Sequence, residues 1–268
     1  MLWKRIATAA VLLPLLVVTV LYGKGWPFAL LVLAATLLCA GEYFRMFLPS
    51  PRDRWAGVAV TGLTYASGAL IPYPAAVSAI LLCVGMAAFP FLSVEGTPEG
   101  RVRSAALSVL GVVYIGGFLS TWPRTLLLPG GEHWVLLGIL VVAAGDTFSY
   151  FVGRAFGKTP LSPRLSPNKT VEGSIGGLLA SVLSAAAYAA VFLPAVQTGF
   201  ILVAAALLGA AGQGGDLFES MLKRAAGVKD SGTLLPGHGG MLDRADGIIA
   251  AGPVLHLLAV VSRQTGGA

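Results

Sequence analysis

The sequence predicts an all-α, polytopic membrane protein with about nine transmembrane helices, a cytoplasmic N-terminus and a polar, cytosol-facing cavity in its C-terminal half. Three observations support this prediction: the composition, a succession of apolar stretches and an uneven distribution of basic residues. Of the 268 residues, 56% are apolar and only 11% are charged, whereas a soluble domain carries about 25% charged residues. This composition excludes an ordinary water-soluble enzyme and a nucleic-acid-binding domain, because too few polar side chains remain to cover a soluble surface.

Nine apolar stretches follow one another along the chain, separated by clusters of proline, glycine and charged residues. They run over 6–22, 26–44, 55–71, 74–93, 104–121, 133–153, 173–193, 198–221 and 244–262. Each is expected to be helical, because backbone polar groups inside hydrocarbon must be satisfied within their own segment. The first stretch follows Lys4 and Arg5 but precedes no clear small-residue cleavage site, so we expect a retained helix.

The basic residues support the same arrangement. With nine spans, 15 of the 18 lysines and arginines lie on one side of the membrane, and only Lys24, Arg124 and Arg263 lie on the other. Cytoplasmic loops carry an excess of lysine and arginine. The asymmetry therefore predicts that the N-terminus and the basic connections face the cytoplasm.

Acidic residues are concentrated in the second half of the chain, where seven of the twelve fall between residues 146 and 246. This distribution predicts two regions. Residues 1–130 would form a scaffold of membrane helices and supply dimer contacts. Residues 131–268 would carry the catalytic helices and cytoplasmic loops. Glycine-rich stretches in the second region, including 209–215, are interpreted as sites of close helix packing.

Two pairs of acids stand three residues apart at the predicted cytoplasmic ends of consecutive helices. Asp216 and Glu219 lie near the end of the eighth span, and Asp243 and Asp246 lie at the start of the ninth. Antiparallel neighbours bring these ends together, and four uncompensated carboxylates would repel one another. A divalent cation resolves that conflict, and Mg²⁺ is held by a few carboxylates together with substrate phosphates. Surface ion pairs at helix ends are the alternative interpretation.

Asp146 lies within the sixth span, eight residues before Arg154 and roughly 12 Å below the predicted cytoplasmic surface. Acids inside a membrane usually face a wet cavity or pathway, although a structural acid paired with a cation is the alternative. In the connections, Lys169 precedes a predicted helix N-terminus that favours anions. Lys229 can meet a phosphate, and Gly239-Gly240 permits close backbone approach.

The last cytoplasmic connection carries a specific resemblance. Residues 220–232, SMLKRAAGVKDSG, continue to 235–246, LPGHGGMLDRAD, and this run closely resembles the signature of phosphatidate cytidylyltransferases, the CDP-diacylglycerol synthases. The lead-in over 215–220 is similar to the family as well, as is the pattern Asp146…Tyr150…Gly153-Arg154…Phe156-Gly157-Lys158. Asn168 stands where many members carry lysine, which is a departure from the family pattern. In the first 130 residues, the resemblance is only to a multi-helix membrane segment.

The resemblance implies an integral membrane nucleotidyltransferase that converts CTP and phosphatidate to CDP-diacylglycerol and pyrophosphate in phospholipid biosynthesis. It implies Mg²⁺ as the cofactor, with a second, monovalent cation as an option, and it assigns Asp216, Glu219, Asp243 and Asp246 to the metal. The residues expected to be catalytic are Asp216, Asp243, Asp246 and Lys223. The residues expected to bind substrate are Asp146, Lys169, Arg224, Lys229, His238, Gly239, Gly240 and Arg244. For His238, general base, phosphate donor and loop hydrogen-bonder are open from the residues alone; the resemblance favours binding.

The resemblance also implies a homodimer with a site open to the inner leaflet, in the inner (plasma) membrane. The lipid bilayer, CTP and phosphatidate are the expected partners, and no nucleic acid is expected. One alternative is a CTP-dependent lipid alcohol kinase, which would release CDP rather than pyrophosphate. Another is a transporter, suggested by the intramembrane position of Asp146.

Overall fold

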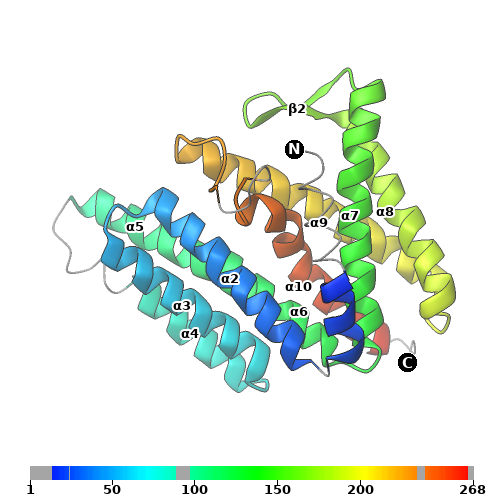
Figure 1. Ribbon diagram of the computed structural model, residues 1–268, viewed down its shortest axis with the longest axis horizontal. Helices are drawn as coiled ribbons and strands as arrows, with labels where there is room; N and C mark the ends of the chain where they lie inside the picture. The colour runs from blue at the N-terminus through cyan, green and yellow to red at the C-terminus, as the bar shows by residue number, and fades with distance from the viewer. Residues whose placement is uncertain (1–13, 24, 89–96, 234–238, 265–268) are drawn as a thin grey trace. The chain divides into compact units, whose positions relative to one another are not determined.

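A computed structural model describes residues 14–23, 25–88, 97–233 and 239–264 of the chain (Figure 1). Its helices are α2 (Trp26–Phe47), α3 (Pro51–Leu70), α4 (Ala75–Ala88), α5 (Pro98–Gly111), α6 (Phe118–Leu126), α7 (Gly131–Phe156), α8 (Val171–Phe192), α9 (Thr198–Ala225) and α10 (Leu242–Gln264). A π-helical segment, η2 (Val112–Gly117), joins α5 to α6, so that Pro98–Leu126 is one continuous helical stretch.

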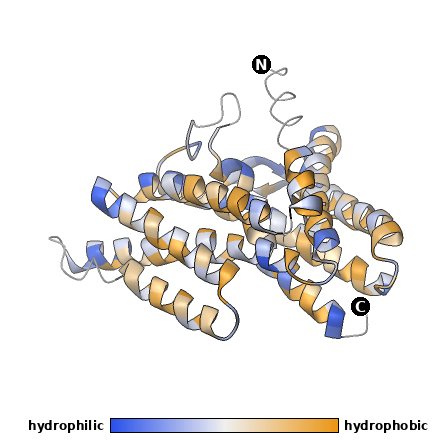
Figure 2. Cartoon of the chain, turned by 60° about the horizontal axis from the view of Figure 1, so that its bottom comes forward, coloured by the Kyte–Doolittle hydropathy of each residue, from blue (hydrophilic) through white to orange (hydrophobic). Residues whose placement is uncertain are grey.

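Six helical stretches among the described residues are long and apolar enough to cross a membrane: α2, Pro98–Leu126, α7, α8, α9 and α10. Apolar residues run along the lengths of the helices, and hydrophilic residues gather near helix ends (Figure 2). The prediction of a helical, polytopic membrane protein is therefore confirmed. Helices occur in all nine predicted stretches as far as the structure describes them, but α3 is not among the six long apolar helices and α4 has only 14 residues. In the stretch over 6–22, residues 14–22 are helical, and residues 6–13 lie outside the described residues.

The connection between α7 and α8 contains two short strands that the all-α prediction missed. Strands β1 (Pro160–Ser162) and β2 (Ser166–Thr170) pair antiparallel, with Pro160 opposite Thr170 and Ser162 opposite Ser166. Backbone pairing, rather than a buried apolar face, forms this hairpin. Its sequence therefore shows no alternation of apolar and polar residues that would predict strands. Glu172 stabilises the start of the hairpin, because its carboxylate accepts hydrogen bonds from the backbone N–H groups of Lys158 and Thr159.

The chain forms two compact units. The first comprises residues 1–124 and 226–245, and the second comprises 125–225 and 246–268, so the division passes through the first turn of α10. The predicted division of roles at residue 130 stays a prediction.

In the first unit, aromatic side chains of α2 fix that helix against its neighbours. The Tyr43 hydroxyl donates to the carbonyl oxygen of Leu107 on α5 at 2.9 Å, and Phe44 is completely buried. A Cβ added to Gly57 of α3 would lie 2.8 Å from the Phe44 ring. These contacts hold the end of α2 that carries Glu42 in a defined position.

In the second unit, α7 and α8 run side by side (Figure 1) at very short distance. A Cβ added to Gly145 of α7 would lie 2.7 Å from the Ser181 hydroxyl of α8, and one added to Gly173 would lie 2.7 Å from the Ser149 carbonyl oxygen. Ser181 also donates to the Val141 carbonyl oxygen at 2.9 Å. The prediction that small residues allow close helix packing is confirmed for this pair.

Candidate functional site

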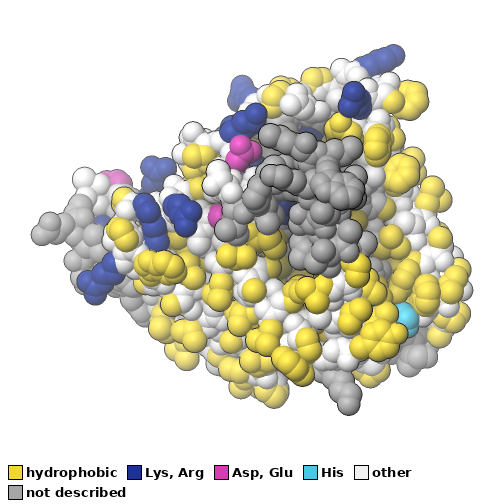
Figure 3. Space-filling view, in the orientation of Figure 1, with side chains coloured by type: hydrophobic (Ala, Val, Ile, Leu, Met, Phe, Trp, Pro, Cys, Tyr) yellow, Lys and Arg dark blue, Asp and Glu magenta, His cyan; other side chains and the backbone are white. Residues whose placement is uncertain are grey.

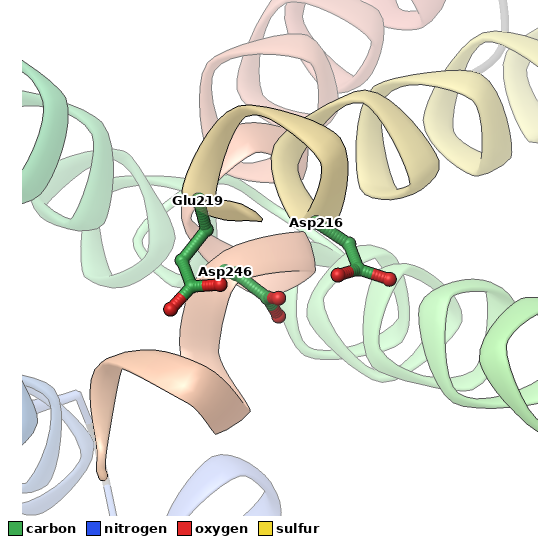
Figure 4. A group of neighbouring side chains, drawn as sticks. All are labelled: Asp216, Glu219 and Asp246. Atoms are coloured by element: carbon green, nitrogen blue, oxygen red, sulfur yellow. The ribbon is translucent and has the colours of Figure 1, made fainter. Parts of the chain in front are cut away.

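Three carboxylates come together on α9 and α10 in the second unit. Asp216 and Glu219 project from one face of α9 and Asp246 from the first turns of α10 (Figure 4). One ligand oxygen from each of the three lies within 4.8 Å of the other two. We call these residues the acidic triad. Carboxylate oxygens at this spacing match the hard oxygen ligands that Mg²⁺ prefers.

Glycine on α9 makes this meeting possible. A Cβ on Gly215 would lie 2.5 Å from the Asp246 carbonyl oxygen and 2.6 Å from the Cβ of Ala250. A Cβ on Gly212 would have only ordinary contacts, the nearest at 3.5 Å to Val142 of α7, and nothing lies within 4 Å of a Cβ placed on Gly214. Gly215 therefore sets the separation of the two helices next to the acidic triad.

Two lysines pair with the triad. The Lys169 ammonium lies 2.5 Å from Asp216, and the Lys223 ammonium lies 2.6 Å from Glu219, whose side chain is fully buried. Buried carboxylates are destabilising unless they are paired. The two ammonium groups could neutralise phosphate oxygens, and the carboxylates that they now contact could bind a divalent cation. The residues present therefore fit a divalent cation bound together with a polyanion.

Local structure explains the position of Lys169. It is the penultimate residue of β2, and the next residue, Thr170, is the N-cap of α8, with its hydroxyl accepting from Gly173 N at 3.1 Å. This confirms that the basic connection leads directly into a helix N-terminus, a location that favours anions. The hairpin thus presents Lys169 to Asp216 of α9.

Asp146, on α7, adds a fourth acid to this region. It interacts electrostatically with Asp216 and Lys169, and also with Asp246. Part of its surface is exposed in the structure. The structure therefore groups Asp146 with the triad by charge, although it is not one of the three closely spaced ligands.

Asp243 has a different environment in the first unit. Its carboxylate accepts hydrogen bonds from the backbone N–H groups of Ser231, at 3.1 Å, and Gly240, at 2.8 Å. It is not a member of the acidic triad. Gly239 has φ +83°, the left-handed region that favours glycine. The Gly239-Gly240 pair therefore does allow a tight backbone conformation, and metal binding by Asp243 stays a prediction.

The other predicted binding residues are basic side chains at the surface. Arg224, Lys229 and Arg244 are exposed, and Arg224 donates to the Leu165 carbonyl oxygen at 3.4 Å. On the face shown in Figure 3, hydrophobic side chains cover most of the described surface, and lysines and arginines form separate clusters. His238 lies outside the described residues.

Glu42 was missed by sequence reasoning. Its carboxylate accepts hydrogen bonds from Ser231, Met241 and Leu242, all in the first unit. A signal was present, because Glu42 is the single acid in an otherwise apolar predicted span, as is Asp146 in its own. What no local pattern provides is the partner, about 190 residues further along the chain.

The sequence is similar to known cytidylyltransferases. The model of the cytidylyltransferase family matches residues 3–262. A phosphatidate cytidylyltransferase of Staphylococcus haemolyticus is 41% identical over 166 residues, covering 58% of this chain and 59% of that protein. That of Staphylococcus saprophyticus is 40% identical over 157 residues, with 58% and 59% covered. That of Staphylococcus epidermidis is 37% identical over 190 residues, with 66% and 68% covered.

The matched region thus spans about 59% of the length of the first two relatives. The family match itself covers nearly the whole chain, including the acidic triad and Asp243. The chain belongs to the cytidylyltransferase family.

Proposed function

We propose that this protein is an integral membrane phosphatidate cytidylyltransferase, which converts CTP and phosphatidate to CDP-diacylglycerol and pyrophosphate. The observation that carries the proposal is the acidic triad with its two lysines, in a chain of the cytidylyltransferase family. The relatives named phosphatidate cytidylyltransferase support the choice of lipid substrate.

In the proposed reaction, a phosphate oxygen of phosphatidate forms a bond to the α-phosphorus of CTP. The bond between that phosphorus and the oxygen bridging to the β-phosphorus breaks, and pyrophosphate leaves with the electron pair. Phosphatidate is already anionic near pH 7, so no protein base is required. Two strongly negative reactants must approach each other, so positioning and charge neutralisation dominate catalysis.

Different residues would bind the metal ion and the phosphate groups. Asp216, Glu219 and Asp246 would hold Mg²⁺, with Asp243 as a further predicted ligand; a bound Mg²⁺ would neutralise phosphate charge and polarise the reacting phosphorus. Lys169 and Lys223 would exchange their present carboxylate partners for phosphate oxygens. Arg224, Lys229, Arg244 and, from the sequence, His238 would bind the remaining phosphate oxygens, and Asp146 would shape the local charge.

We further propose the finer topology: nine spans, a cytoplasmic N-terminus and a site that opens to the cytoplasm and the inner leaflet of the plasma membrane. The 15-to-3 division of basic residues supports it. A homodimer, with contacts in the first 130 residues, belongs to the same proposal.

The decisive test is product identification with purified protein in detergent. We expect protein supplied with Mg²⁺, CTP and phosphatidate to form CDP-diacylglycerol, detected by mass spectrometry, and to release one pyrophosphate for each lipid. Release of CDP with phosphorylation of a lipid alcohol would instead identify a kinase. Absence of any liponucleotide in this compartment-free assay would favour transport.

A further inference from the structure

The buried carboxylate of Glu42 has no part in the chemistry proposed above. Glu42 lies near the end of α2 and is only 5% exposed. A carboxylate in an apolar helix is costly unless hydrogen bonds compensate for lost hydration. The partners of Glu42 therefore indicate why an acid occupies this position.

The three hydrogen-bond donors to Glu42 among the described residues belong to the segment that leads into α10. Oε1 accepts from Met241 N at 2.9 Å, and Oε2 accepts from Leu242 N at 2.8 Å. Oε2 also accepts from the Ser231 hydroxyl at 2.9 Å. Leu242 is the first residue of α10, where backbone N–H groups have no partner within the helix and where negative charge is favourable. Glu42 thus caps α10 from a different helix.

Two neighbouring glycines lie very close to this carboxylate. A Cβ on Gly232 would lie 2.5 Å from Glu42 Oε1, and a Cβ on Gly240 would lie 2.5 Å from Oε2. A side chain at Gly232 would displace the carboxylate, and one at Gly240 would displace both the carboxylate and the Ser231 hydroxyl. The backbone therefore approaches Glu42 as closely as glycine allows.

Asp243 holds the same backbone from another direction, through its hydrogen bonds to Ser231 N and Gly240 N. Ser231 is consequently fixed twice, at its hydroxyl by Glu42 and at its N–H by Asp243. These contacts tie the first turn of α10 to α2 within one compact unit.

We propose that Glu42 is a positioning residue for metal binding: it fixes the first turn of α10, which carries Asp243 and leads, one turn later, to Asp246. Glu42 touches neither metal nor substrate. It acts through the start of α10, because both N–H groups that it binds belong to Met241 and Leu242. The proposal rests on the function proposed above for the role of the metal.

Glu42→Gln tests the proposal with little change in shape. The amide nitrogen cannot accept a hydrogen bond, so at least one of the two backbone N–H groups loses its acceptor, and the negative charge at the helix terminus is removed. We expect the Mg²⁺ concentration for half-maximal activity to rise at least five-fold, with much of the rate recovered at saturating Mg²⁺. Glu42→Asp keeps the charge but is one methylene too short, so the same direction of change is expected. Glu99→Gln, an exposed acid in the first turn of α5, is the matched control and should leave the Mg²⁺ requirement unchanged.

Hydrogen–deuterium exchange without substrate provides a readout that does not depend on turnover. Peptides covering 239–245 should exchange at least ten-fold faster in Glu42→Gln, while peptides from α8 exchange as in the wild type. Mg²⁺ should also raise the melting temperature less in this variant. If the wild-type protein makes no CDP-diacylglycerol, the proposed function fails, but these two measurements still decide the role of Glu42.

A half-maximal Mg²⁺ concentration within two-fold of wild type in Glu42→Gln would overturn the proposal. So would a loss of rate that only follows the loss of folded protein. Should Glu42→Gln fail to fold, Ser231→Ala decides the question, because it removes one of the three donors and leaves the carboxylate in place. We expect a smaller rise in the Mg²⁺ requirement for Ser231→Ala, and an unchanged requirement contradicts the proposal.

Discussion

Replacing Asp246 with asparagine is expected to abolish turnover and, at the same time, to raise the melting temperature of the metal-free protein. Asp246 is 9% exposed and lies within ligand distance of Asp216 and Glu219. Without a metal ion, three neighbouring carboxylates repel one another, so a neutral amide relieves part of that repulsion. The asparagine oxygen can still accept from Gly247 N, which now donates to the Asp246 carboxylate at 2.7 Å. The substitution therefore keeps this hydrogen bond.

With Mg²⁺ bound, the wild-type protein should melt at a higher temperature than Asp246→Asn, the reverse of the order without metal. The wild-type protein gains stability from any ligand that binds only the folded state, and Asp246→Asn should lose most of this gain. We expect activity at least 100-fold below wild type, about 2.7 kcal/mol of activation free energy. Melting curves in detergent with and without Mg²⁺, together with the product assay, measure both effects. Glu132→Gln, in the first turn of α7, removes an acid of the same unit outside the triad and should change neither. Near-normal turnover of Asp246→Asn would refute the metal assignment.

The acidic triad shows what spacing in the sequence can predict. Asp216 and Glu219 share a face because they are three residues apart on a helix, and Asp246 reaches them because α10 follows α9 in the chain. Such inferences need only helical periodicity and the fact that consecutive antiparallel helices bring their adjoining ends together. The sequence assigned Lys169 to substrate and Asp216 to the metal, and it did not predict the ion pair between them.

What the sequence could not predict depends on contacts across long stretches of chain or on backbone pairing. Glu42 is joined to residues 231–242 by tertiary packing, which leaves no periodic signal. Asp243 has the same i, i+3 spacing from Asp246 as the α9 pair, yet its carboxylate binds backbone N–H groups of the preceding loop. The β1–β2 hairpin was missed because its strands bury no apolar face.

Gly215→Ala should lower activity at least ten-fold, although it adds only a single methyl group. The new Cβ would lie 2.5 Å from the Asp246 carbonyl oxygen and 2.6 Å from Ala250 Cβ, both on α10. Neither contact can be relieved by rotating a side chain, so α9 and α10 must move apart. Because Asp216 and Glu219 are on α9 and Asp246 is on α10, the ligand oxygens would separate with the helices. Titration of activity with Mg²⁺ should show a raised requirement.

The adjacent residue supplies a control. It separates the effect of pushing α9 away from α10 from the effect of replacing glycine with alanine within a helix. Gly214→Ala adds the same methyl one residue earlier in α9, where nothing lies within 4 Å. Alanine in a helix interior is favoured over glycine by about 1 kcal/mol, so this variant should melt at the same or a higher temperature and keep wild-type activity. Both substitutions restrict the backbone of α9 by replacing a glycine with alanine. Only Gly215→Ala places a methyl group against α10. If the two variants behave alike in activity and in Mg²⁺ response, the close approach at Gly215 does not control the triad, and its oxygens must be held in place by other contacts.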